Sequence, residues 1–160
     1  MKDKVAKLRR RRARRSAAAL ILILPQTLVR RWRKEGITLL PPESPQATAD
    51  AFARVGSVAT RDVLEFYSEF GGMEPMDDGF LKIWSLSEIV ADNPERSEFG
   101  PLFADYLISC WSFRLKPVNA QTSAVYVDHH SGPQPPELVA KSLAEFLAIY
   151  ERDPKAAHAW

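Results

Sequence analysis

A chain of 160 residues is long enough for one folded domain and an additional segment, and 46% hydrophobic residues are sufficient to build a core. The single cysteine, Cys110, excludes an intramolecular disulfide and favours a cytoplasmic, reducing location. The net charge of +2 is too small by itself to indicate a partner.

This small net charge hides two oppositely charged regions. Residues 1–34 contain 13 Lys or Arg and one acidic residue, which gives a net charge of +12. Residues 35–160 contain 9 Lys or Arg and 19 Asp or Glu, a net charge of −10. Because an acidic surface repels nucleic acid and attracts basic molecules, we expect the folded part to bind a basic partner.

The amino-terminal region begins with an arginine-rich run, Arg9–Arg15, followed by the apolar stretch Ala17–Leu24. Eight apolar residues are too few for a membrane span, which takes about 20, and no signal-peptide cleavage pattern follows. Three interpretations stay open: a segment held at a membrane surface, a nucleic-acid-binding arm, or a non-native extension. We expect residues 1–34 to be disordered or weakly helical and to make no contact with the core.

The entrance to the domain is marked by prolines at 41–42 and by two helix starts. Ser44 is a favourable N-cap, Pro45 suits the first helical position, and Gly56 suits the position after the helix end. Thr60 is the expected cap of the next helix.

That next helix is the most strongly patterned part of the chain. Apolar and aromatic side chains recur at helical spacing: Val63, Phe66, Tyr67 and Phe70. The glycine pair 71–72 predicts the helix end, because glycine adopts the left-handed conformation without a steric penalty. A polar turn at 74–79 then leads into Phe80–Trp84, which we expect to be a strand with at least one buried face.

The remaining elements follow from capping and composition. Ser85 and Glu88 have the spacing of a capping box and predict a short helix that ends near 93–94. We then expect one or two strands over Leu102–Leu115, an antiparallel strand over Ala124–Asp128, and a final helix from Pro136 to Asp153. Helices at both ends with strands between them predict an α+β domain over residues 35–154, with an antiparallel sheet packed by helices, and a tail at 155–160.

Four segments in this order resemble the SUKH superfamily of Smi/Knr-like domains. The segments are Leu64–Gly72 with the acidic turn after it, the Trp84-ended strand with Leu86–Ile89, Phe103–Ser109, and Val139–Leu147. The structural motif of the resemblance consists of Phe66, Tyr67, Phe70, Gly71, Gly72 and Trp84. The resemblance covers about residues 36–154 and implies one SUKH-like domain. Many members are bacterial immunity proteins, which neutralise a toxin by covering its active site.

Residues for catalysis or metal binding are sparse. His129 and His130 follow Asp128, but adjacent strand residues point to opposite faces and would not share a metal. Cys110 lies in an apolar stretch and is expected in the core, and the acidic pair 77–78 precedes a glycine, as turns often do. Because no phosphate loop or nucleophile motif is present, we expect no catalytic residue, metal or cofactor.

The sequence therefore predicts a non-enzymatic, protein-binding module. The resemblance implies an immunity protein whose partner is a toxin. We expect that partner to be a basic toxin domain of the nuclease type, because a nuclease must attract phosphate. The candidate contact residues are acidic: Glu69, Glu74, Asp77, Asp78, Asp92, Glu95 and Glu98. Two alternatives stay open: a regulatory scaffold of the same fold without a toxin, and an adaptor tethered to nucleic acid or membrane through residues 1–34. We expect neither nucleic acid nor membrane to bind the folded domain itself.

Overall fold

A computed structural model describes residues 23–130 and 132–157. Predictions about the arginine-rich run, most of the apolar stretch after it, and residues 158–160 lie outside the described residues. Within the described part, the helices are α2 (Gln26–Lys34), α3 (Pro45–Arg54), α4 (Arg61–Glu69), α5 (Leu86–Asp92) and α6 (Leu143–Arg152). The strands are β1 (Thr38–Leu39), β2 (Met73–Glu74), β3 (Leu81–Ile83), β4 (Leu102–Tyr106), β5 (Trp111–Pro117), β6 (Ser123–Asp128) and β7 (Glu137–Ala140).

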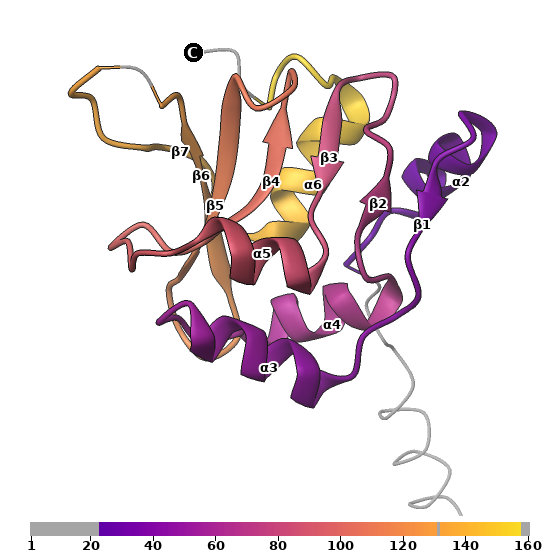
Figure 1. The fold of residues 1–160 in the computed structure, drawn as a ribbon. Helices are drawn as coiled ribbons and strands as arrows, with labels where there is room; N and C mark the ends of the chain where they lie inside the picture. Colours follow the sequence, from indigo (N-terminus) through magenta and orange to yellow (C-terminus); the bar gives the residue numbers. More distant parts are fainter. Residues whose placement is uncertain (1–22, 131, 158–160) are drawn as a thin grey trace, which may run out of the picture.

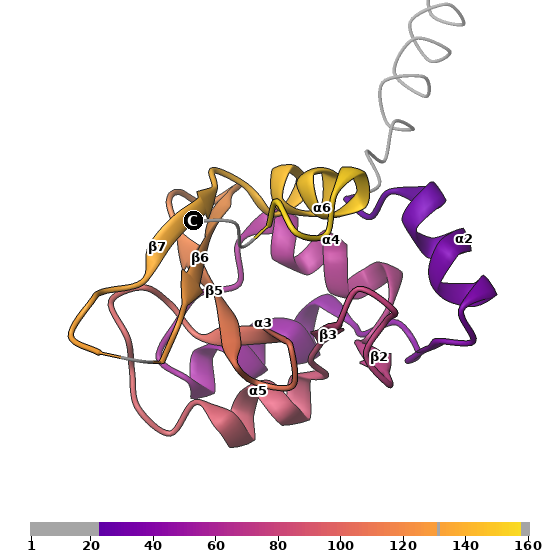
Figure 2. The ribbon, with the colours of Figure 1, turned by 90° about the horizontal axis from the view of Figure 1, so that it is seen from above.

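These elements form the α+β domain that the sequence predicts. Five strands make an antiparallel sheet in the order β3-β4-β5-β6-β7, and β1 pairs with β2 beside it. Helix α6 lies on one side of the large sheet, whereas α3 and α5 lie on the other side (Figures 1 and 2). Phe146 of α6 contacts Phe103 and Phe113 of the sheet, with ring centroids 6.1 and 4.8 Å apart. One part of the core therefore sits between α6 and the sheet, and the same cluster continues through buried side chains of α2, α3, α4 and α5.

Helix α4 buries the aromatic stripe that the sequence predicts. Phe66, Tyr67 and Phe70 are almost completely buried, and the ring of Phe66 lies 5.2 Å from Tyr67 and 5.0 Å from Phe70. The Tyr67 hydroxyl donates a hydrogen bond of 3.0 Å to the carbonyl of Trp84, which is itself buried. The motif residues thus hold α4 against the end of β3.

Glycine is required at the two positions after α4 for a different reason from the one predicted. The helix ends at Glu69, Phe70 is extended, and only Gly72 has a positive φ, of 121°. A Cβ atom at Gly71 would lie 2.4 Å from the carbonyl oxygen of Pro41, and one at Gly72 would lie 2.8 Å from the amide of Ser85. Glycine is required here mainly because two backbone segments pass very close to the chain.

The predicted starts of α3 and α5 are confirmed. The Ser44 side chain accepts from the amide of Ala47 at 3.1 Å, and Ser85 and Glu88 form the full capping box. Thr60 precedes α4 as predicted, but its hydroxyl bonds to a carboxylate oxygen of Asp62 rather than to the helix backbone.

The predicted boundary after residue 34 is wrong in the part of the chain that the structure describes. Ile23 and Leu24 are buried, and α2 buries Leu28, Val29 and Trp32 in the same core cluster as the rest of the domain. The apolar spacing along this segment places these side chains on one helical face, with arginines and lysine on the other. At the carboxyl end, buried Ala157 extends the domain beyond residue 154.

Two further predictions are wrong. The segment predicted to start the last helix forms β7 instead, where Ala140 pairs with Val125, and α6 begins after Ser142. Cys110 is exposed rather than buried, because the chain turns between β4 and β5. Three successive residues of that turn, Leu107–Ser109, have positive φ.

Candidate functional site

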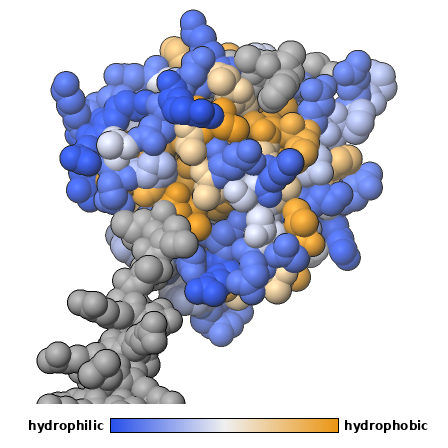
Figure 3. Space-filling view, turned by 180° about the vertical axis from the view of Figure 1, so that it is seen from behind, coloured by the Kyte–Doolittle hydropathy of each residue, from blue (hydrophilic) through white to orange (hydrophobic). Residues whose placement is uncertain are grey.

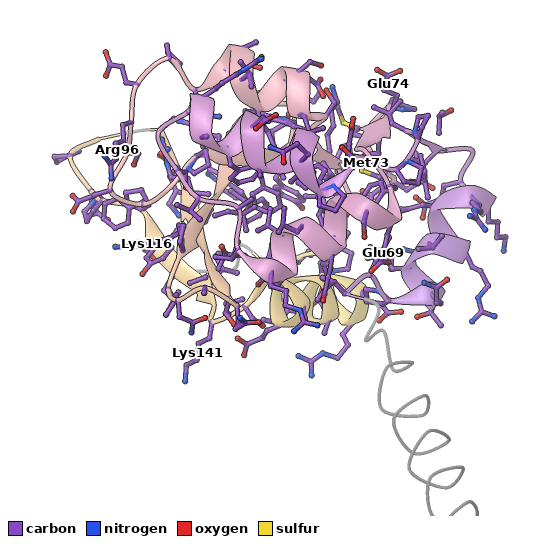
Figure 4. All side chains as sticks on the ribbon, turned by 90° about the horizontal axis from the view of Figure 1, so that it is seen from below. Glu69, Met73, Glu74, Arg96, Lys116 and Lys141 are labelled. Atoms are coloured by element: carbon purple, nitrogen blue, oxygen red, sulfur yellow. The ribbon has the colours of Figure 1, made fainter. Side chains whose placement is uncertain are left out.

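The seven predicted contact residues do not form one surface. Glu69 and Glu74 lie on one side of the molecule, whereas Arg96, which falls between Glu95 and Glu98 in the chain, lies on the opposite side (Figure 4). We therefore distinguish the acidic turn, residues 74–78, which runs from the last residue of β2 towards β3, from the α5 loop, residues 92–100, which runs from the last residue of α5 towards β4.

Asp77 of the acidic turn is not available to a partner. It is only 3% exposed. Its carboxylate accepts hydrogen bonds from the Trp32 indole nitrogen at 2.7 Å, the Tyr150 hydroxyl at 2.6 Å and the Leu81 amide at 3.0 Å. Burial, together with this neighbouring carboxylate, raises the pKa of Tyr150. The prediction of Asp77 as a contact residue is therefore wrong: it joins α2, β3 and α6.

Glu69 also serves the fold. Its Oε1 accepts from the backbone amides of Ile23 at 2.8 Å and Leu24 at 3.3 Å, which fixes the chain where it enters α2. Burial raises the pKa of Glu69, although the two amide hydrogen bonds act in the opposite direction. Of the turn residues predicted for contact, Glu74 and Asp78 remain exposed.

The α5 loop presents its acidic side chains to solvent. Asp92, Glu95 and Glu98 are all exposed, and none of them forms an ion pair with another described residue. The loop is nevertheless fixed by the buried side chain of Asn93. This amide donates to the carbonyls of Ile89 at 2.8 Å and Leu102 at 2.9 Å, and accepts from the Leu102 amide at 2.7 Å. The three carboxylates therefore project from an anchored loop.

A pocket of about 300 Å³ opens beside this loop. It is lined by Gly56, Ser57, Val58, Arg96, Ser97, Glu98, Gly100, Lys116 and Pro117. Two large apolar side chains lie at it or next to its lining: Val58 is 66% exposed, and Val118, which follows Pro117, is 63% exposed. We call the α5 loop, the pocket and these two valines the pocket face. The labelled Arg96 and Lys116 lie on the same side of the molecule (Figure 4).

The two histidines have different partners, but not for the reason predicted: β6 ends at Asp128, and His130 has a positive φ of 54°, so strand alternation does not apply to them. The His129 ring contacts Trp111, with centroids 5.4 Å apart. His130 Nε2 lies 2.8 Å from Ser112 Oγ, and its Nδ1 lies 3.6 Å from Asp128 Oδ1. This order of groups is that of a nucleophile, a base and an orienting acid. Ser112 is only 2% exposed, however, so a substrate carbonyl has no access to its Oγ in this structure.

Asp128, the acid of that group, already forms an ion pair with Arg114. Arg114 Nε donates to Asp128 Oδ2 at 2.8 Å. Burial raises the pKa of Asp128, but the hydrogen bonds from the His130 amide and from Arg114 outweigh burial and lower the pKa below its usual value. The arrangement is best explained as a polar network that joins β5 to β6.

Comparison with protein-family models, curated proteins and solved structures found no match to this chain. Among the described residues, no group of three or more His, Cys, Asp or Glu side chains could hold a metal ion. The described helices are also too short or too polar for any of them to cross a bilayer. The surface chemistry of the chain itself is therefore the guide to its function.

Other apolar side chains reach the surface away from the pocket face. In the view from behind, hydrophobic residues emerge in separate patches between mainly hydrophilic ones (Figure 3). Phe80 and Ile108 are 47% and 72% exposed, and the amide of Leu107 donates to the Phe80 carbonyl at 3.1 Å, which brings the β4–β5 turn beside the start of β3. Among the predicted contact residues, Glu98 lines the pocket, and Asp92 and Glu95 belong to the same loop.

Apart from Glu98, the pocket residues were not found by sequence reasoning. They come from the α3–α4 connection, the α5 loop and the end of β5, which lie far apart in the chain. Only the helix stop at Asn93, which the sequence does predict, indicated that the chain leaves α5 at this point.

Proposed function

We propose that this protein acts without catalysis, by binding a basic protein partner through the pocket face. The observation that carries this proposal is the set of exposed carboxylates of Asp92, Glu95 and Glu98, none of which pairs with a described cation, on a loop anchored by Asn93. An anchored loop loses little conformational freedom when it binds, so more of the interaction energy is available for affinity.

The charge of the domain supports a basic partner. Residues 23–157 contain 13 Lys or Arg and 19 Asp or Glu, a net charge of −6. Long-range attraction accelerates the encounter with a basic surface. The exposed Val58 and Val118 add apolar area beside the acidic loop, and protein interfaces combine an apolar centre with a polar rim.

The resemblance to SUKH immunity proteins gives this proposal a specific form. Neutralisation by covering an active site requires binding alone and no reactive group on the inhibitor. A nuclease toxin must be basic where it holds phosphate, so its cleft is complementary to an acidic loop. The proposed function is therefore that of an immunity protein for a basic toxin domain.

Affinity capture with matched variants tests the proposal. The full chain, the loop variant Asp92→Lys/Glu95→Lys/Glu98→Lys and the turn variant Glu74→Lys/Asp78→Lys are used as baits in extracts of the native cell. We expect a basic protein that is retained by the wild type and the turn variant but not by the loop variant. Purified components then show whether binding blocks a toxic activity of that protein.

Each result has a definite meaning. Retention of no protein by the wild type contradicts the proposal, and so does equal retention by the loop variant. A partner without toxic activity would keep the binding surface and overturn the immunity function, leaving a regulatory scaffold.

A further inference from the structure

The pocket of the pocket face has a charge opposite to that of the domain. Two cationic side chains, Arg96 and Lys116, line it together with one carboxylate, Glu98. Neither cation forms an ion pair with a described residue. By contrast, two other cations of the large sheet are paired, Lys82 with Glu88 and Arg114 with Asp128. Two cations at one pocket of an acidic domain, neither paired with a carboxylate of the described chain, require an explanation.

Arg96 is placed by a glycine. A Cβ atom added at Gly56 would lie 3.2 Å from Cδ and 3.3 Å from Cγ of the arginine. Gly56 also has a φ of 72°, which favours glycine independently. The absence of a side chain at this position lets the arginine stem lie against the α3–α4 connection at the wall of the pocket.

Lys116 is placed by two aromatic rings. Its Nζ lies 5.1 Å from the centroid of Phe99 and 5.7 Å from that of Tyr126. These rings contact each other at a centroid distance of 5.3 Å. Cation–π attraction therefore holds the ammonium group at the end of β5 without neutralising its charge.

From this arrangement we infer that the pocket is an oxyanion site, which takes a carboxylate or phosphate group between Arg96 and Lys116. Arginine and lysine are the side chains that bind such groups through charge-assisted hydrogen bonds. Ser57 and Ser97 line the same pocket, and a serine hydroxyl can add a neutral hydrogen bond to an anion. A volume of about 300 Å³ suits a small ligand or a single anionic side chain.

This site goes beyond the proposed function, because it uses the cations of the pocket and not the carboxylates of the loop. Glu98 lies at the pocket, and no cation in the described part of the chain pairs with it, so its charge opposes a bound anion. Occupation of the pocket and capture of a basic partner can therefore be tested separately.

The experiment is a titration of the full chain followed by backbone amide NMR at constant ionic strength. Inorganic phosphate and succinate are the probes, and chloride is the reference anion. We expect saturable shifts of the amide signals of Ser57, Ser97 and Gly100 with phosphate, succinate or both, and none with chloride. A response to phosphate alone assigns a phosphate group, and a response to succinate alone assigns a carboxylate.

Variants assign the response to the pocket. Arg96→Gln and Lys116→Gln should each weaken binding about tenfold or more, the effect expected for loss of one charge-assisted hydrogen bond. Lys116→Arg should retain binding, and Glu98→Gln should strengthen it several-fold. Lys141→Gln, an exposed lysine outside the pocket (Figure 4), is the matched control and should change nothing. Absence of a saturable response, or equal weakening by the Lys141 and Arg96 variants, overturns the inference.

Discussion

The acidic turn and the α5 loop look alike in sequence and are used differently by the fold. Each is a short polar segment with several carboxylates after a helix or strand. In the turn, Asp77 is withdrawn from solvent and joins three elements through hydrogen bonds. In the loop, the anchor is the neutral amide of Asn93, and all three carboxylates stay exposed.

The comparison shows that local acidity does not identify a binding surface. A carboxylate is buried where tertiary structure supplies enough donors, and an indole, a hydroxyl and a backbone amide supply them at Asp77. Where a neutral side chain already satisfies the backbone, the carboxylates remain free for a partner. The following predictions test this distinction, from the largest expected effect to the smallest.

The largest effect on stability is expected from removing Trp32, the hydrogen-bond donor that α2 contributes to Asp77. Trp32 is completely buried, so Trp32→Ala should lower the free energy of unfolding by about 3–5 kcal/mol, because transfer energy is lost and a cavity remains. Urea denaturation measures it, with the exposed neighbour changed in Arg33→Ala as control. Similar midpoints for the two variants would contradict the placement of α2 in the core.

Removal of the Asp77 carboxylate, the acceptor of these hydrogen bonds, should have the next largest effect on stability. Asp77→Ala leaves the Trp32, Tyr150 and Leu81 donors buried without their acceptor, and we expect a loss of about 2–4 kcal/mol in unfolding free energy. Asp78→Ala, at the exposed adjacent position, should change it by less than about 0.5 kcal/mol. Equal effects of the two changes in urea would show that the turn carboxylates are equivalent.

A smaller effect on stability is expected when the pH is lowered. Burial raises the pKa of Glu88, but the hydrogen bonds from Lys82 and Ser85 outweigh it and lower the pKa below its usual value. A lowered folded-state pKa contributes stability above the unfolded value of about 4.3, and this stability is lost as the pH falls through the folded value. In thermal melts from pH 6 to pH 2, Glu88→Gln should therefore show a shallower loss of stability than the wild type. An unchanged slope would exclude Glu88 from the acid response.

The smallest effect on stability is expected in the α5 loop. Because Asp92, Glu95 and Glu98 are exposed and unpaired within the described chain, reversing all three to lysine should change the unfolding free energy by less than about 1 kcal/mol. Urea denaturation at moderate salt measures this change in the unfolding free energy. A large loss would mean that the loop carboxylates support the fold, as Asp77 does.

Much of the fold could be predicted from the sequence, because local signals determine it. The aromatic spacing of α4 and the capping box of α5 are properties of neighbouring residues, and both are confirmed. The role of Asp77 could not be predicted, because Trp32 and Tyr150 lie 45 and 73 positions away in the chain. Helix α2 was missed although its apolar spacing was present, since the strong basic charge of residues 1–34 concealed it.

The candidate site was predicted only in part. The exposed positions of Asp92, Glu95 and Glu98 agree with the hypothesis, but the pocket depends on the approach of Gly56 to Arg96 across two connections. That proximity is a tertiary property which no local pattern indicates. The SUKH resemblance and the immunity function stay predictions.

Association kinetics with the captured basic partner test the central claim most directly. The wild type, the turn variant and the loop variant are compared by surface-based kinetics at low and at physiological salt, where the Debye length falls to about 8 Å. We predict that the turn variant keeps the wild-type association rate and its decrease with salt. The loop variant should associate far more slowly, with that decrease abolished or reversed. The opposite pattern, with association lost in the turn variant and kept in the loop variant, would contradict the assignment of the binding surface to the α5 loop.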